Sequence, residues 1–146
     1  MENLLKNENP VFGVIGGGSW ATANVKLLTG NNRKLNWYMR DTNAIEHIKK
    51  YHHHSKYLSS VELDADKFFI TNDINKVVEE SDILIFAVPS AYFISEVSSI
   101  KASYDGKMII SAVKGFVGDE HYTIAEYFHN IHNIPFDRIG VISGPC

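Results

Sequence analysis

The order of apolar runs and helix-like segments most restricts what this chain can fold into. Short apolar runs, few of which alternate with polar residues, recur along the chain and are separated by segments of helical period. Runs of this kind are typical of strands buried on both faces of a parallel sheet. We expect strands at residues 11–15, 35–39, 68–71, 83–88, 108–113 and 139–142.

The segments between these runs have the spacing of helices. Asp41 or Thr42 and Asn72 or Asp73 are expected to begin two of them, because these side chains are good N-caps. Strand and helix patterns alternate without a linker, so the sequence predicts one α/β domain over residues 1–146. Apolar stripes mark the helices at Trp20, Ala23, Leu27 and Leu28, at Ile45 and Ile48, at Ile74, Val77 and Val78, and within residues 92–100 and 122–131.

A glycine-rich turn directly follows the first expected strand, in the stretch VIGGGSWATA at residues 14–23. Gly16, Gly18 and Ala21 fit the pattern G-x-G-x-x-A, in which the second glycine lets the backbone approach a pyrophosphate. The phosphates would lie on N–H groups of a helix that begins near Ser19. The pattern favours a Rossmann-type, doubly wound, mainly parallel sheet with helices on both faces and a bound dinucleotide. The alternative is a glycine-rich turn in an unrelated α/β fold.

Arg40 ends the second expected strand, where a Rossmann fold meets the adenine ribose. An arginine there pairs with the 2′-phosphate of NADP, whereas an acidic side chain accepts from the 2′-hydroxyl of NAD. Asp41 follows immediately, so NADP and NAD both stay open. The alternative is a solvated Arg40 beside an Asp41 that only caps a helix.

Two further strand ends point to the same crevice, because open α/β sheets bind ligands at the carboxyl ends of their strands. Pro89 and Ser90 end the fourth expected strand and would bring backbone close to the ribose or nicotinamide. Lys114 follows the fifth and offers a charge to an anionic or carbonyl-bearing substrate. An ordinary surface lysine is the alternative.

Composition narrows the classes of function. The 146 residues carry a net charge of −3, which favours no nucleic-acid surface, and no apolar run approaches the ~20 residues that span a bilayer. Cys146 is the sole cysteine and the start of the chain lacks a secretory pattern, so a cytoplasmic protein is expected. The chain ends just after an expected strand, and we expect it to be a truncated part of a longer protein.

Histidines are the remaining candidates for a metal site. Consecutive side chains on a helix point about 100° apart, so His52, His53 and His54 cannot all face one ion. We therefore expect no metal, and place these residues on a helix end or loop near the adenosine. The other histidines are expected at the surface, at His47, His121, His129 and His132.

Together the motifs resemble the bacterial type of NAD(P)-dependent glycerol-3-phosphate dehydrogenase. The resemblance covers residues 11–146 and rests on GGGSWATA, WYMRD, KYLSS, DILIFAVPS, SAVKGF and SGPC, in that order. It implies reversible reduction of dihydroxyacetone phosphate to sn-glycerol 3-phosphate for glycerophospholipid synthesis, with this chain as the N-terminal cofactor domain. For the full-length protein it implies a homodimer.

The resemblance also implies roles for individual residues. The family's general-acid lysine and phosphate-binding arginine would lie beyond this chain, so no catalytic residue is expected within it. The chain departs from the family's usual residues at Ala21, at Ser59 and Ser60, and at Cys146, which removes a hydroxyl. Cofactor contacts are implied at Ser19, Trp20, Arg40, Tyr57 and Lys114, and substrate contacts at Lys114, Gly144 and Cys146.

Two other functions fit the same residues. One is the cofactor domain of another NADP-linked oxidoreductase, of the 6-phosphogluconate or hydroxyacid type. The other is a non-catalytic nucleotide-sensing module, which has no need of Lys114 at the substrate side of the crevice. A general-acid lysine and a phosphate-binding arginine further along would single out the glycerol-3-phosphate dehydrogenase.

Overall fold

The order of the strands places β1 beside β4 at the middle of the sheet. The computed structural model describes residues 7–143, and in this part six strands form one sheet in the order β3-β2-β1-β4-β5-β6. Every neighbouring pair is parallel. All six lie within the expected runs, so the predicted parallel sheet is confirmed. The strands are β1 (Phe12–Ile15), β2 (Leu35–Tyr38), β3 (Phe68–Thr71), β4 (Ile83–Phe86), β5 (Met108–Ser111) and β6 (Ile139–Val141).

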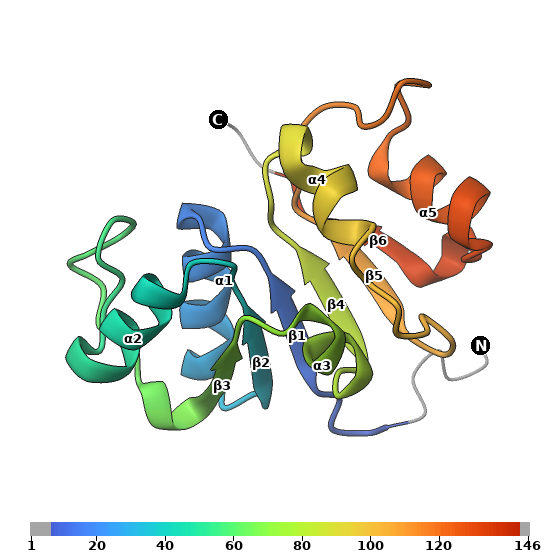
Figure 1. Cartoon of the computed structure of the whole chain (residues 1–146). Helices are drawn as coiled ribbons and strands as arrows, with labels where there is room; N and C mark the ends of the chain where they lie inside the picture. The colour runs from blue at the N-terminus through green and yellow to red at the C-terminus, as the bar shows by residue number, and fades with distance from the viewer. Residues whose placement is uncertain (1–6, 144–146) are drawn as a thin grey trace.

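Helices cover both faces of this sheet (Figure 1). On one face the core joins the strands to α1 (Ser19–Gly30) and α2 (Thr42–Tyr51). On the other it joins them to α3 (Ile74–Glu79), α4 (Ser90–Val97) and α5 (Ile124–His132). Short 3₁₀ helices at Ala65–Lys67 and Phe136–Arg138 precede β3 and β6. The doubly wound, Rossmann-type arrangement is therefore confirmed.

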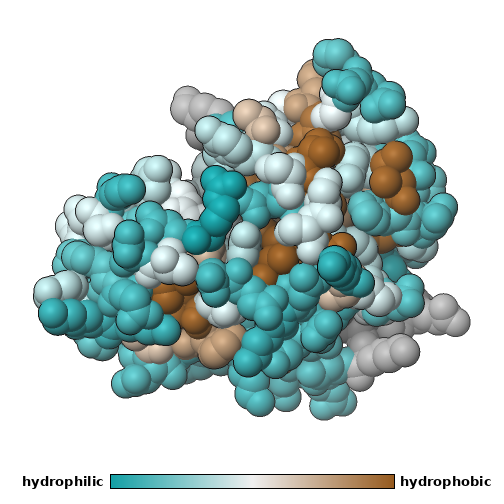
Figure 2. Space-filling view, in the orientation of Figure 1, coloured by the Kyte–Doolittle hydropathy of each residue, from teal (hydrophilic) through white to brown (hydrophobic). Residues whose placement is uncertain are grey.

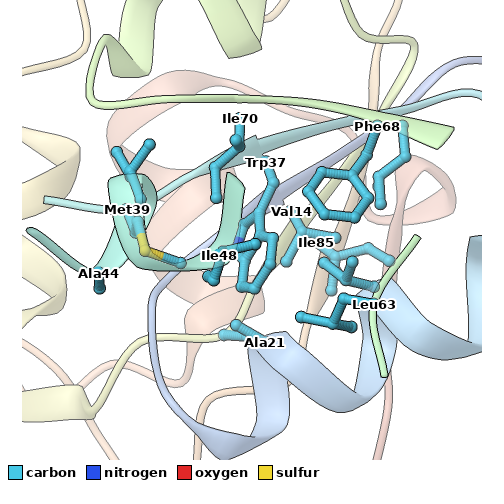
Figure 3. Packing of buried hydrophobic residues seen from close by; sticks show 14 of the residues in the cluster. Val14, Ala21, Trp37, Met39, Ala44, Ile48, Leu63, Phe68, Ile70 and Ile85 are labelled. Atoms are coloured by element: carbon cyan, nitrogen blue, oxygen red, sulfur yellow. The ribbon is translucent and has the colours of Figure 1, made fainter. Parts of the chain in front are cut away.

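Trp37 of β2 occupies the centre of the core on the α1–α2 face. Its side chain is fully buried and meets Phe68 edge to face, with ring centroids 5.6 Å apart. Figure 3 shows the indole with Ala21 of α1 below it and Ile48 of α2 beside it. Ala21 is fully buried, as expected of a small residue that lets the helix approach the sheet.

The helices of residues 7–143 include no candidate for a membrane span. None of them is long and apolar enough to cross a membrane. Figure 2 shows several separate apolar patches, over α4, α5, the middle of the molecule and the region between α2 and β3, within a mostly hydrophilic surface.

The apolar stripe expected on α1 is wrong for two of its four residues, since Leu28 packs against the core and Ala23 is half-buried. Trp20 is 43% exposed and Leu27 64% exposed, so these side chains do not face the core. The polar members of the buried face each donate to a carbonyl of an earlier turn, at 2.8–2.9 Å. Because their polar atoms are satisfied locally, they are buried at little cost, and a search for apolar residues misses them. The face that is buried consists of Ala21, Thr22, Asn24, Val25 and Thr29.

Two helix ranges and three of the histidine placements also differ from expectation. α4 begins at Ser90 and ends at Val97, since Pro89 starts a helix here instead of ending a strand in a loop. α5 begins after Thr123, whose side chain and that of Glu126 form a capping box. His132 is not a surface residue, because its ring packs against those of Tyr104, Tyr127 and Phe128. His47 and His129 are half-buried too, whereas His121 is exposed.

Candidate functional site

The candidate site lies where the connections from β1 and β4 diverge. The two strands are paired along their length, ending with Ile15 beside Phe86. From β1 the chain enters α1 on one face of the sheet, and from β4 it enters α4 on the other. Figure 1 shows both helices beginning at the same end of the sheet. In open α/β sheets such a switch point leaves a crevice in which ligands bind.

Gly16 allows the turn that leaves β1. Its φ is +139°, a region that side chains disfavour, and a Cβ there would overlap the carbonyl oxygen of Ala87. The end of β4 therefore approaches the backbone of the turn so closely that only glycine fits. In the pattern G-x-G-x-x-A the first glycine allows the tight turn after the strand, and Gly16 has this role here.

Gly18 has the opposite surroundings. Its backbone is extended, at φ −93° and ψ −172°, which any residue adopts. No atom lies within 4 Å of the position that a Cβ would take, so the glycine leaves open space in front of α1. An absent side chain at an unstrained, open position is what the approach of a bulky ligand group requires.

The carbonyl groups of the turn are held by two buried side chains. The indole N–H of Trp37 donates to the Gly16 carbonyl at 2.7 Å. His54 contacts the Gly17 carbonyl through Nε2 at 3.1 Å, while its Nδ1 accepts from the backbone N–H of Lys56 at 3.1 Å. Since Nδ1 accepts, the proton of the neutral ring is on Nε2, and burial lowers the pKa of His54, which favours this neutral form. Both carbonyls are thus occupied by protein donors.

The N–H groups of the first turn of α1 have no cap. The first N–H groups of any helix lack intrahelical acceptors, and the N-cap Gly18 provides no side-chain acceptor. α4 begins in the same way, with Pro89 as an N-cap residue that provides no side-chain acceptor. Both helices present N–H donors and the positive end of their dipoles toward the crevice, a combination that favours an anion such as a pyrophosphate.

Two adjoining cavities lie at these helix ends. The first, of about 250 Å³, reaches from the glycine turn to the end of β2, and the second, of about 310 Å³, reaches from the start of α1 to Lys114. They share Gly18, Val88 and Pro89 in their linings. Two hollows joined at the uncapped helix ends match the shape of a dinucleotide, whose halves meet at a pyrophosphate.

All the expected cofactor residues that the structure describes line one or both cavities. Gly16, Gly18, Arg40, Tyr57 and Pro89 line the first. The second is lined by Gly18, Ser19, Trp20, Pro89 and Lys114. Gly144 and Cys146, expected to contact substrate, lie outside the described residues. Another hollow of about 430 Å³ lies between the segments that precede β5 and β6, and includes none of the expected residues.

Arg40 is exposed but makes specific contacts. Its guanidinium lies 3.5 Å from a carboxylate oxygen of Glu96 and 6.0 Å from the ring centre of Tyr92. Asp41 accepts from the N–H of Ala44 and so caps α2, as one alternative expected. That hydrogen bond lowers the pKa of the Asp41 carboxyl group. Arg40 therefore lies at the rim of the first cavity and contacts Glu96, while its side chain remains 71% exposed.

Four residues of the site were not found from the sequence alone. Trp37 and Tyr38 were assigned only to a strand, His54 to a loop face, and Glu96 to an ordinary helix position. His54 lies just after α2, where a helix end or loop was expected, but it is 2% exposed, and its contact with the glycine turn was not expected. Each of these residues contacts a residue that is distant in the chain. The one available signal in the sequence is a polar residue within an otherwise apolar segment.

The strand order, the glycine turn at the switch point and the uncapped start of α1 define the Rossmann class of α/β proteins. Residues 12–146 match the family described as NAD-dependent glycerol-3-phosphate dehydrogenase N-terminus, and the chain belongs to this family. It is 31% identical over 141 residues to a glycerol-3-phosphate dehydrogenase (NAD(P)+) of Pseudomonas syringae pv. syringae, covering 97% of this chain and 40% of that protein. A relative from Nitratidesulfovibrio vulgaris with the same name is 32% identical, covering 90% of this chain and 40% of that protein.

Solved structures agree with this assignment. Glycerol-3-phosphate dehydrogenase of Plasmodium falciparum superposes with a TM-score of 0.79 at 26% identity, over 94% of this chain and 41% of that one. A ketopantoate reductase-like protein from Ralstonia solanacearum gives a TM-score of 0.61 at 16% identity, over 94% of this chain and 46% of that one, and shows the shared fold alone. The chain spans about 40% of the length of the curated relatives it matches.

Proposed function

We propose that residues 1–146 form a domain that binds NAD(H) or NADP(H), and that it is the cofactor part of an sn-glycerol-3-phosphate dehydrogenase. The observation that carries the proposal is the open space at Gly18 in front of the uncapped α1. The turn has no side chain there, the helix N–H groups are without a cap, and both neighbouring carbonyls are bound by buried side chains. A pyrophosphate supplies the acceptors that this arrangement lacks.

In this proposal the adenosine half of the cofactor lies in the first cavity, which Tyr57 lines, with Arg40 at the ribose. The nicotinamide half lies in the second, beside Trp20, Pro89 and Lys114. Ser19 and the first turn of α1 hold the phosphates between them. The bound nicotinamide would supply the hydride that reduces a ketone or accept it in the reverse direction.

The proposed substrate pair is dihydroxyacetone phosphate and sn-glycerol 3-phosphate. The names of the relatives support it, and so does the presence of Lys114 in the lining of the second cavity. Lys114 would orient the substrate, together with Gly144 and Cys146. Reduction of a ketone also needs a general acid at the carbonyl oxygen, which we assign to a lysine outside residues 1–146. We further propose a cytoplasmic homodimer, in keeping with a sequence that has a single cysteine.

Titration and turnover test the proposal. In isothermal calorimetry the 146-residue chain should bind NADH or NADPH with one site per chain. It should not reduce dihydroxyacetone phosphate measurably, since the loss of an acid and a phosphate-binding group costs several powers of ten in rate. A full-length relative provides the positive control for turnover. If neither dinucleotide binds, the assignment of the crevice fails. Turnover by the chain at a rate comparable to that of the relative would show that the acid lies within it.

A further inference from the structure

Glu96 brings a negative charge to the ribose end of the crevice from the other half of the molecule. It lies in α4, on the face of the sheet opposite to α1 and α2, and is 8% exposed. Its Oε2 accepts from the hydroxyl of Tyr38 at 2.7 Å, and its Oε1 lies 3.5 Å from Nη1 of Arg40. One buried carboxylate therefore joins the end of β2 to α4.

The Tyr38 hydroxyl keeps this carboxylate in place. Burial of Tyr38, and after it the hydrogen bond to Glu96, raises the pKa of Tyr38, so the hydroxyl stays protonated and donates. The carboxylate is fixed on one side by a strand residue and meets the Arg40 guanidinium on the other. A fixed, desolvated charge acts more strongly on a nearby group than an exposed and mobile one.

The charged side chains that line the first cavity balance one another. Arg40 is paired with Glu96, and Lys56 lies 3.8 Å from the carboxylate of Asp41. His54, the remaining titratable group of basic type in the lining, is held in its neutral form by burial. This end of the crevice therefore has no surplus positive charge, although its sequence contains an arginine and a lysine.

We infer that Glu96 determines coenzyme choice by offsetting the charge of Arg40, and that it makes the crevice favour NAD(H) over NADP(H). The inference rests on the proposed function and extends it. A 2′-phosphate carries up to two negative charges and would lie near the Glu96 carboxylate, whereas the 2′-hydroxyl of NAD is neutral. If Arg40 paired fully with the phosphate, it would give up its ion pair with Glu96. The buried Glu96 carboxylate would then lack that partner, which is unfavourable. The arginine at the strand end is therefore not by itself a mark of NADP.

Calorimetric titration of NADH and NADPH tests this inference on the 146-residue chain and on Glu96→Gln. Glutamine retains the shape and the acceptor for Tyr38 but removes the charge. The wild type should bind NADH about tenfold or more tighter than NADPH. Glu96→Gln should tighten NADPH binding about tenfold or more and change NADH binding by less than about threefold, because only NADPH has charge at this position.

Glu46→Gln is the matched control. Glu46 lies in α2, its side chain is 75% exposed, and its carboxylate lies 3.4 Å from the ammonium group of Lys49. The same change of charge there should alter neither affinity by more than about twofold, because exposed charges are screened. Circular dichroism of each variant establishes that it is folded.

The outcomes separate this inference from the proposed function. If the wild type binds neither dinucleotide, the proposed function fails. If it binds both and Glu96→Gln leaves the ratio of the two affinities unchanged, the crevice stands and the role of Glu96 is overturned. Weaker NADPH binding in this variant would also overturn it, because Glu96 would then only orient Arg40. If Glu96→Gln does not fold, the wild-type ratio decides: a preference for NADPH contradicts the inference.

Discussion

The helices that begin at the switch point differ in their first residues from the other helices described. α2, α3 and α5 are capped by the side chains of Asp41, Asp73 and Thr123. α1 and α4 have Gly18 and Pro89 as their N-cap residues and therefore have no side-chain cap. A cap stabilises a helix by about 0.5–2 kcal/mol, so the two crevice helices lack a contribution that the others have. The two helices whose N–H groups face the candidate site are therefore the ones that lack the stabilisation of a side-chain cap.

The largest expected effect comes from giving α1 the cap that α2 has. Gly18→Asp fits the extended backbone and the open space there, so the free energy of unfolding should rise by a few tenths of a kcal/mol. The carboxylate would occupy and repel the phosphate position, so NADH binding should weaken at least about 100-fold, or about 2.7 kcal/mol. Calorimetry and urea denaturation measure the two effects.

Gly30→Asp is the control for that substitution. Gly30 ends the same helix, and nothing lies within 4 Å of a Cβ at this position either. An acidic residue at a helix C-terminus should change stability by less than about 1 kcal/mol and leave NADH affinity within about twofold. Equal losses of NADH affinity in the two variants would show that the effect of Gly18→Asp is not local. Occupation of the phosphate position by a cap would then no longer explain that effect.

Removing a cap from one of the other helices should have the reverse pattern. The Asp73 carboxylate accepts from the N–H groups of Asn75 and Lys76, at 3.1 and 3.2 Å. Asp73→Ala should reduce the free energy of unfolding by about 1 kcal/mol. Dinucleotide affinity should stay within about twofold, since α3 begins away from both cavities. A tenfold loss of affinity in a folded variant would mean that capped helices also serve the site.

The smallest effect is a dependence of stability on pH, in which His54 beside the glycine turn and the cap Asp41 of α2 act in different pH ranges. Burial lowers the pKa of His54 in the folded chain, so the unfolded chain takes up the proton first, and stability is lost as pH falls below about 6.5. The slope should not exceed about 1.4 kcal/mol per pH unit for one proton. Asp41 has a lowered pKa because it accepts from Ala44, so its contribution is lost only in more acid solution.

Urea denaturation at pH 7.5, 5.5 and 3.5 measures this dependence. His54 faces Asp41, His47 and Lys56, and a glutamine in its place cannot titrate in this range. His54→Gln should therefore reduce the loss between pH 7.5 and 5.5. The remaining loss belongs to His132, whose pKa burial also lowers. An unchanged slope in His54→Gln would rule out His54 as the titrating group.

Local pattern in the sequence predicted the fold well. All six strands, the caps at Asp41 and Asp73 and the start of α1 at Ser19 lie where short-range signals place them. Such signals suffice because a buried strand, a helix cap and a glycine turn each leave a recognisable pattern in a few contiguous residues. The face of α1 was missed for the converse reason, since Thr22, Asn24 and Thr29 are polar but satisfied within their own helix.

The candidate site was predictable only in part. The glycine turn and the strand ends were recognised because their chemistry lies in contiguous residues. The supports of the site join segments far apart: Trp37 acts on Gly16, His54 on Gly17, and Glu96 on Arg40. No local pattern relates Glu96 to Arg40, because the strand order, which brings α4 beside the end of β2, forms only on folding.

The two tryptophans report on different parts of the molecule. Trp37 is fully buried and bonded to the turn, whereas Trp20 is 43% exposed and lines the second cavity. Reduced nicotinamide absorbs light where indoles emit, so energy transfer from Trp20 should register occupancy of that cavity. The emission maximum of Trp37, set by a dry environment, should shift only when the sheet opens. A Trp20→Phe variant would leave Trp37 as the single tryptophan, whose emission follows unfolding, and the difference between the tryptophan spectra of the two proteins would report on the crevice.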